Sequence, residues 1–160
     1  MQSSSEEADN SRVHDIELKR AVGAEHFKAR RYHEAIIEWI AIDRELKESG
    51  NRDAKLLSNI AAAQLSINKL VAASMYGAEA TDVDPDWWKG YFYRGQALLA
   101  LVRNKPPSKA MGDRLEQAIA SFKACKHCST VPPSKIPEID NLIKNANSLG
   151  LSMTTVCSQQ

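Results

Sequence analysis

The sequence predicts an all-α fold of stacked helix pairs, and three observations support this expectation. Only seven glycines and six prolines occur among 160 residues, which disfavours a turn-rich β fold. Hydrophobic residues make up 43% of the chain, enough for a packed core, and alanine, the best helix former, occurs in short runs. Small residues also recur at a spacing of 34 positions. We therefore expect one helical repeat domain over residues 14–150, between flexible tails at 1–13 and 151–160.

Apolar residues spaced 3.6 positions apart place the helices, and glycine and proline place the breaks. Gly50 ends the second helix, and Asn68 marks a short break. In Asp84-Pro85-Asp86, proline suits the first turn of the next helix and aspartate its cap. Proline pairs at 106–107 and 132–133 require loops. Helices are expected over about 16–29, 32–49, 54–67, 69–82, 87–102, 113–126 and 136–149.

An internal repeat relates these helices in pairs. Gly23, Ala61 and Gly95 occupy equivalent positions: 34 residues separate the last two, and a four-residue insertion at 50–53 extends the first interval to 38. Each repeat has a second small residue where the two helices of a pair should touch: Ala35, Ala73 and Ala118. In the third repeat an 11-residue insertion around Pro106-Pro107 precedes this residue. The repeats span about 16–49, 54–87 and 88–128, and a capping helix spans about 135–149.

Two strings resemble tetratricopeptide repeats. One, after Gly23, is Tyr32-His33-Glu34-Ala35-Ile36, and the other resembles a repeat junction of the co-chaperone members: Asp84-Pro85-Asp86-Trp87-Trp88-Lys89-Gly90-Tyr91. The resemblance covers about 16–128, and the last helix is similar to the capping helix of such arrays. It implies a right-handed α-solenoid of three tetratricopeptide helix pairs plus a C-terminal capping helix, whose first helices line a concave groove. The capping helix should have a polar outer face: Lys135, Glu138, Asp140, Lys144 and Asn145.

The co-chaperone members bind Glu-Glu-Val-Asp tails of the seventy- and ninety-kilodalton heat-shock chaperones through a five-residue carboxylate clamp. Transferred by position, the resemblance implies that Asn59 and Lys89 keep the usual residues, and that Arg20 replaces a lysine while still able to bind a carboxylate in a forked pair. Ala24 replaces an asparagine and Tyr93 an arginine, with Arg94 one position further around the helix. The clamp is therefore degenerate.

The rest of the expected groove is cationic with apolar surface. Glu17, Arg20, Lys28, Lys55 and Lys89 contribute four positive charges and one negative charge. Such a groove suits an acidic or C-terminal peptide with one or two hydrophobic anchors. Apolar surface is expected from Phe27, Leu65, Phe92, Tyr93 and Leu99. The function favoured is thus a co-chaperone-like adaptor without catalysis, cofactor or metal, a module of the kind usually joined to another domain.

Charge and cysteine content bear on partner and compartment. Twenty-one basic against twenty acidic residues argues against nucleic-acid binding, and short apolar stretches argue against a membrane span. The N-terminus is polar and acidic, unlike a secretory signal, and three cysteines suggest no disulfide framework, so we expect a cytoplasmic protein.

Other candidate chemistry is weak. Cys125-Lys126-His127-Cys128 lacks a second pair of zinc ligands, with Cys157 in the expected tail, so Cys125 is interpreted as a core residue equivalent to Ala80. Trp39 is expected in the core, and Trp87 and Trp88 at a repeat junction. Two alternatives stay open: a scaffold whose partner docks on the convex face or the Pro106-Pro107 insertion, and a nucleic-acid accessory domain with strongly salt-dependent binding.

Overall fold

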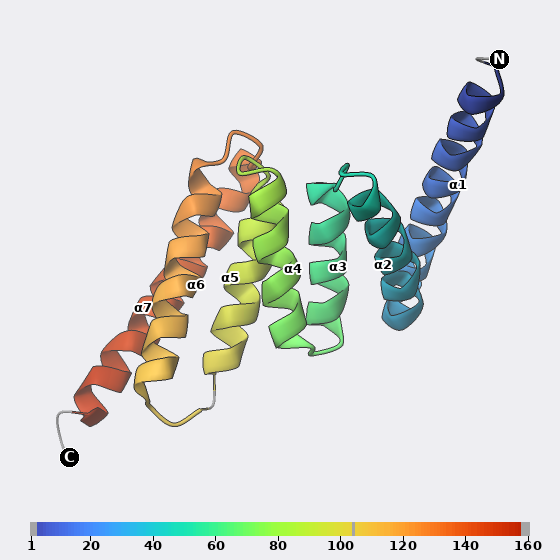
Figure 1. The fold of residues 1–160 in the computed structure, drawn as a ribbon. Coiled ribbons are helices and arrows are strands. Elements are labelled where there is room, and N and C mark those ends of the chain that lie inside the picture. The colour runs from blue at the N-terminus through green and yellow to red at the C-terminus, as the bar shows by residue number, and fades with distance from the viewer. Residues whose placement is uncertain (1–2, 104, 158–160) are drawn as a thin grey trace. The chain divides into compact units, whose positions relative to one another are not determined.

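The computed structural model describes residues 3–103 and 105–157, which form seven α-helices and one short 3₁₀ turn and contain no strand (Figure 1). They divide into two compact units, one up to Arg52 and one from Asp53 onward. Unit 1 contains α1 (Ser3–Lys28) and α2 (Tyr32–Glu48). Unit 2 contains α3 (Ala54–Ser66), α4 (Leu70–Val83), α5 (Trp88–Val102), α6 (Lys109–His127), the turn η1 (Pro133–Lys135) and α7 (Ile136–Cys157). The all-α prediction is confirmed.

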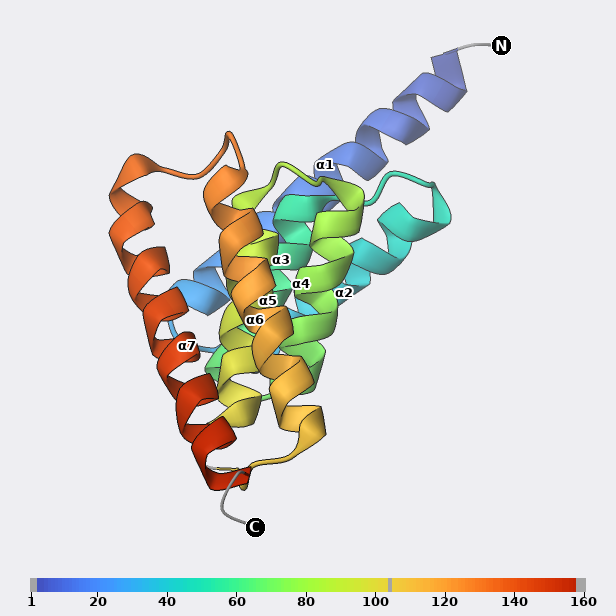
Figure 2. The ribbon, with the colours of Figure 1, turned by 90° about the vertical axis from the view of Figure 1, so that its left-hand side faces the viewer.

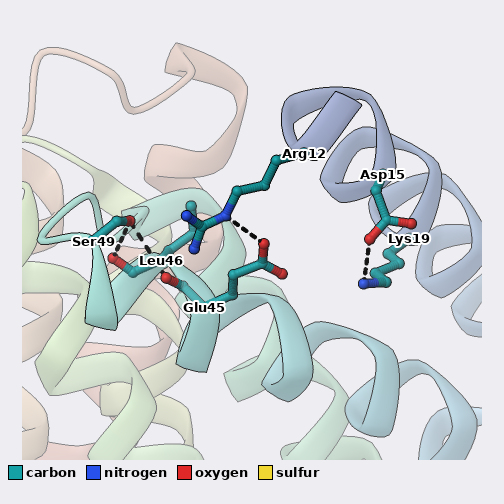
Figure 3. A network of polar contacts seen from close by, with 6 residues as sticks. All are labelled: Arg12, Asp15, Lys19, Glu45, Leu46 and Ser49. Atoms are coloured by element: carbon teal, nitrogen blue, oxygen red, sulfur yellow. Dashed lines mark hydrogen bonds and ion pairs between the residues drawn. The ribbon is translucent and has the colours of Figure 1, made fainter. Parts of the chain in front are cut away.

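Both terminal helices are longer than predicted. Helix α1 begins at Ser3, so most of the expected tail over 1–13 is helical, with residues 1–2 outside the described chain. No glycine or proline interrupts residues 3–22, and Arg12 Nε lies 2.8 Å from Glu45 Oε1 of α2, which holds this early part of α1 against its partner helix (Figure 3). A second ion pair, Lys19 with Asp15, lies within α1 itself.

Helix α7 likewise continues to Cys157, through most of the tail expected over 151–160, and residues 158–160 lie outside the described chain. Gly150 does not end the helix, because it lies against Leu115 of α6, whose Cδ2 would be 3.3 Å from a Cβ at that position. No helix among the described residues is both long and apolar enough to cross a bilayer.

Unit 1 is a single helix pair closed around Trp39. A Cβ on Gly23 of α1 would lie 2.3 Å from Trp39 Nε1, so only glycine permits this approach of the two helices. The Trp39 side chain is 3% exposed, which confirms its predicted core position, and Ala35 is fully buried. Phe27 completes the cluster, with ring centroids 5.7 Å from Trp39 and 5.2 Å from Tyr32.

In unit 2 each helix packs against the next, and α3 also contacts α5 directly. Figures 1 and 2 show that α3, α5 and α7 run in one direction while α4 and α6 run in the opposite direction. The N-terminal ends of α3, α5 and α7 therefore lie at the same end of unit 2. This arrangement positions the candidate site described below.

Small residues lie at the helix contacts of unit 2, as the repeat predicts. A Cβ on Gly95 of α5 would lie 2.6 Å from Phe122 Cε1 of α6. On α4, a Cβ on Gly77 would lie 2.9 Å from the backbone nitrogen of Arg94. Ala73 and Ala118 are fully buried. Phe122 follows Ala118 by four positions, as Trp39 follows Ala35. Units 1 and 2 therefore share one packing arrangement, in which a glycine of one helix lies against an aromatic ring of the next.

The turns and the α4–α5 junction refine the predicted boundaries. Arg30 and Asn68 both have φ of 60°, in the turns that follow α1 and α3, and Gly50 has φ of 73° after α2. The prediction that an aspartate of Asp84-Pro85-Asp86 caps the next helix is wrong: Asp84 accepts a hydrogen bond from the Asp86 N–H, and neither aspartate caps α5. The Asp86 carboxylate instead accepts hydrogen bonds from the backbone N–H (2.6 Å) and the hydroxyl of Ser129, while Trp87 occupies the cap position of α5. Asp86 thereby fixes the segment after α6 to the α4–α5 junction.

Candidate functional site

Three lysines gather at the end of unit 2 where α3, α5 and α7 begin. Lys55 is the second residue of α3, Lys89 is the second residue of α5, and Lys135 is the last residue of η1, directly before α7. The three helices run in the same direction, so their N-termini add partial positive charge at the same end. This end of unit 2 is therefore suited to anionic groups.

The rings of Trp87 and Trp88 contact two of these lysines, Lys55 and Lys89. The Nζ atom of Lys55 lies 5.4 Å from the centre of the Trp87 ring, and that of Lys89 lies 5.8 Å from the same ring and 5.9 Å from Trp88. Trp87 is fixed in turn, because its Nε1–H donates to Ser58 Oγ at 2.9 Å. Such contacts contribute about 0.5–1 kcal/mol each at exposed sites. Within the described chain neither lysine has a carboxylate partner, so both ammonium groups can donate hydrogen bonds to a ligand carboxylate.

One helical turn further, Asn59 follows Lys55 on α3, and Tyr93 follows Lys89 on α5. Residues four apart lie on the same side of a helix, so both side chains extend the lysine surface. Asn59 is exposed, whereas Tyr93 is half-buried with its ring 5.5 Å from Phe92. The pKa of Tyr93 is raised, mainly because the phenol is partly buried. The positive charge of Lys135 opposes this rise, and the negative charge of Glu138 adds to it. Tyr93 is accordingly a neutral hydrogen-bond donor.

An apolar pocket of about 270 Å³ continues this surface; its residues come from α3, α5 and α7 and from the position directly after α5: Leu65, Gln96, Leu99, Ala100, Arg103 and Leu142. Gln96 and Ala100 follow Tyr93 by three and seven positions, so the pocket lies on the same stripe of α5 as Lys89. At 1.5 Å per residue, Leu99 lies about 15 Å along the axis from Lys89. We call the lysine end, Asn59, Tyr93 and this pocket the candidate face.

The structure brings together four of the predicted site residues, Lys55, Asn59, Lys89 and Tyr93. Phe92 corrects the prediction of an exposed apolar surface: it is 5% exposed and packs against Trp88 at 5.5 Å, since it belongs to the core between α5 and α6. Leu99, 2% exposed, is also a core residue that reaches the surface only as a wall of the pocket.

The remaining predicted residues, Arg20, Phe27 and Lys28, all lie on α1 in unit 1. Arg20 Nε is 3.2 Å from Glu17 Oε1, and Lys28 Nζ is 2.7 Å from Glu25 Oε1, so both cations have acidic partners on their own helix. Phe27 packs into the α1–α2 cluster instead of standing free.

Lys135 is the residue of the candidate face that the sequence prediction misses. It was expected on the outer surface of the capping helix, but its Nζ lies 5.8 Å over the Phe92 ring of α5. Asp140, from the same expected surface, lies 2.5 Å from Lys126 of α6. The available signal was positional: Lys135 precedes the last helix, much as Lys55 and Lys89 stand in the first turns of α3 and α5.

Cys125 is a structural residue. Cys125 is fully buried, which confirms its predicted core position, and its thiol donates to the Trp88 carbonyl at 3.4 Å. Burial raises the pKa of this thiol to about 12, so it stays protonated. The described residues contain no cluster of three or more metal-ligating side chains, and the side chain of Cys157 lies outside them.

The paired helices, their glycine contacts and a face lined by the first helices of consecutive pairs define a helical-repeat module. Its fold is that of tetratricopeptide repeat domains, as predicted. The chain is similar to the Arabidopsis OM64 TPR domain, with a TM-score of 0.66 and 20% identity over 84% of this chain and 96% of that one. It is also similar to the first TPR of Spaghetti (RPAP3) bound to the HSP90 peptide SRMEEVD, with a TM-score of 0.65 and 20% identity over 83% and 90% of the two chains.

A third similar structure is the TPR2B domain of yeast Sti1 in a pHsp70 complex, with a TM-score of 0.61 and 22% identity over 83% of this chain and 96% of that one. No protein-family model matches the sequence. Among curated proteins, the chain is 31% identical over 91 residues to the DnaJ homolog subfamily C member 7 homolog of Dictyostelium discoideum. The match covers 55% of this chain and 16% of that protein.

Proposed function

We propose that this chain is a non-catalytic peptide-binding module whose ligand is an acidic C-terminal peptide of the heat-shock chaperone type. The observation that supports this most strongly is the convergence of Lys55 and Lys89. They come from the first helices of two consecutive pairs, meet on the same Trp87 ring, and have no carboxylate partner in the described chain. Two ammonium groups held against the same ring without a carboxylate partner favour a ligand with more than one carboxylate.

Four residues of the candidate face contact the ligand in this proposal. Lys55 and Lys89 bind carboxylates, Asn59 donates its amide to one of them, and Tyr93 donates its hydroxyl. Phe92 packs against Tyr93, with ring centroids 5.5 Å apart, and so fixes the position of the phenol.

The pocket sets where the ligand needs an apolar residue. The distance of about 15 Å from Lys89 to Leu99 corresponds to four or five residues of extended chain at about 3.3 Å each. In the HSP90 peptide of the Spaghetti complex, SRMEEVD, a methionine is the fifth residue from the C-terminus. The HSP70 peptide bound to the second TPR domain of human RPAP3, SGPTIEEVD, has isoleucine there. The spacing of the candidate face thus suits peptides of this form.

Fluorescence anisotropy with labelled SRMEEVD tests the proposal. We expect measurable binding that weakens about tenfold or more for the C-terminal amide and for Lys89→Met, since each removes a charge-assisted hydrogen bond. Lys123→Met is the matched control, because Lys123 is exposed on α6, away from the candidate face. Equal affinities for acid and amide, together with an unaffected Lys89→Met variant, would exclude this function.

A second candidate function is a scaffold that binds its partner elsewhere, and one observation favours it. Val71 and Met75 on α4 are 60% and 57% exposed and line a second apolar pocket of about 500 Å³. These are large apolar side chains on a second helix of a pair. A protein partner that the Met75→Glu variant no longer binds and the Lys89→Met variant still binds would support the scaffold function over peptide binding.

A further inference from the structure

Lys135 and Glu138 form an ion pair that has no role in the peptide binding proposed above. Lys135 Nζ lies 2.8 Å from Glu138 Oε2, and both side chains are substantially exposed, at 41% and 44%. The same Nζ lies 5.8 Å over the Phe92 ring, and Phe92 contacts Tyr93 with ring centroids 5.5 Å apart. The pair therefore stands next to Tyr93, at the edge of the candidate face formed by α7.

Tyr93 occupies a place where the face lacks a charge. A phenol offers one hydrogen bond but no positive charge, whereas Lys55 and Lys89 each bring one. Lys135 lies close enough for its charge to affect the ionisation of Tyr93, and Glu138 acts in the opposite sense. The hydrogen bond with Glu138 raises the pKa of Lys135, so its amine is charged whenever a carboxylate ligand is present.

We propose that Lys135 binds a ligand carboxylate beside Tyr93, and that Glu138 is an internal competitor which this carboxylate displaces. The inference rests on the proposed peptide-binding function and adds to it a specificity-determining cation and its built-in counterion. The ligand carboxylate and Glu138 compete for the same ammonium group. A stronger Lys135–Glu138 pair therefore lowers the affinity of the face for acidic peptides. Residues 135 and 138 are three apart, a spacing at which ion pairs in water are weak and readily exchanged.

Two substitutions with opposite expected effects test this proposal in the full chain with labelled SRMEEVD. Lys135→Met removes the charge while its thioether can still pack on Phe92, and it should weaken binding about three- to tenfold. Glu138→Gln removes the competitor with almost no change in shape, and it should strengthen binding about two- to fivefold. The melting temperature of each variant shows that it is folded, and Lys123→Met is again the charge-matched control.

The outcomes separate this inference from the function on which it rests. Weaker binding for Lys135→Met with stronger binding for Glu138→Gln supports both. If Lys89→Met weakens binding while neither Lys135→Met nor Glu138→Gln changes it, the role of Lys135 is refuted and peptide binding stands. If Glu138→Gln also weakens binding, Glu138 supports the face instead of competing, which likewise overturns the proposal. If the acid and amide peptides bind equally, the proposed function itself fails.

Discussion

The two units share one packing arrangement, but the cations on the first helix of each pair have different partners. In unit 1 the α1–α2 contact closes where Gly23 meets Trp39, and in unit 2 the α5–α6 contact closes where Gly95 meets Phe122. Yet Arg20 and Lys28 of unit 1 have carboxylate partners on their own helix, whereas Lys55 and Lys89 of unit 2 lie over Trp87. The repeat therefore conserves the interior of a helix pair and leaves its surface free to differ.

That difference bears on ligand binding. An intrahelical carboxylate satisfies a cation before any ligand arrives, so a ligand must compete for it. An aromatic ring holds a lysine in place without neutralising it. Unit 2 accordingly presents positive charge that a ligand can use, and the strongest binding contributions should come from α3 and α5.

The largest expected effect concerns the shared interior. Trp39→Ala and Phe122→Ala should each lower the free energy of unfolding by about 3–5 kcal/mol, because each removes a buried ring and leaves a cavity beside a glycine. Urea denaturation followed by circular dichroism measures both. Exposed apolar residues supply the controls, and Ile37→Ala in unit 1 and Val71→Ala in unit 2 should cost far less. Clearly unequal costs for the two ring deletions would show that the two contacts are not the same packing arrangement.

A smaller effect tests the glycine side of that contact. Gly95→Ala should lower stability by about 1–3 kcal/mol, since the new Cβ would lie 2.6 Å from Phe122 Cε1. Gly112→Ala on α6 has nothing within 4 Å of its new Cβ and should instead raise stability by about 0.5–1 kcal/mol through helix propensity. Thermal unfolding gives the sign of each change. Stabilisation by Gly95→Ala would contradict the close-contact explanation.

The next prediction sharpens the comparison of the cations. Lys89→Met should reduce affinity for SRMEEVD about tenfold or more, and Lys28→Met less than about threefold. The reason is that Lys28 already pairs with Glu25 on an exposed part of α1. Anisotropy titrations of both variants at one salt concentration measure the ratio. A larger loss for Lys28→Met would place the main binding surface on unit 1.

The smallest effect distinguishes two carboxylates, one in each unit. The hydrogen bond from Lys28 lowers the pKa of Glu25, and the hydrogen bonds from the Ser129 hydroxyl and backbone N–H lower the pKa of Asp86. A depressed pKa in the folded state means stability that is present above the ordinary carboxyl pKa, near 4, and lost as pH falls through the depressed value. Glu25→Gln and Asp86→Asn should therefore be less stable than the unsubstituted chain at pH 7, with both differences shrinking below pH 4.

Salt separates these two carboxylates. The exposed pair of Glu25 with Lys28 is screened by 1 M salt, whereas the neutral donors of Ser129 are not. Urea denaturation at pH 7 in low and high salt should show the Glu25→Gln deficit fading and the Asp86→Asn deficit persisting. The opposite pattern would mean that Asp86 acts through charge alone.

Much of the fold could be predicted from the sequence because its signals are local or periodic. The spacing of Gly23, Ala61 and Gly95 gave the helix pairs, and Trp39 and Cys125 were correctly assigned to the core. The candidate site was predicted less completely. Phe92 was expected at the surface, an aspartate of Asp84-Pro85-Asp86 was expected to cap a helix, and Lys135 was expected to face outward. In each case the side chain is placed by residues from another helix or turn, which periodicity within one element does not reveal.

The sequence by itself determined that this protein is a stack of helix pairs, because helix periodicity, small contact residues and turn residues act over a few positions each. Only the tertiary structure decided which cations are neutralised and which are exposed. That choice depends on what lies within a few ångströms in space, such as Trp87 beside Lys55 and Lys89, or Phe92 beneath Lys135. Coulomb and cation–π interactions fall off over such distances, so residues far apart in sequence set the chemistry of the face.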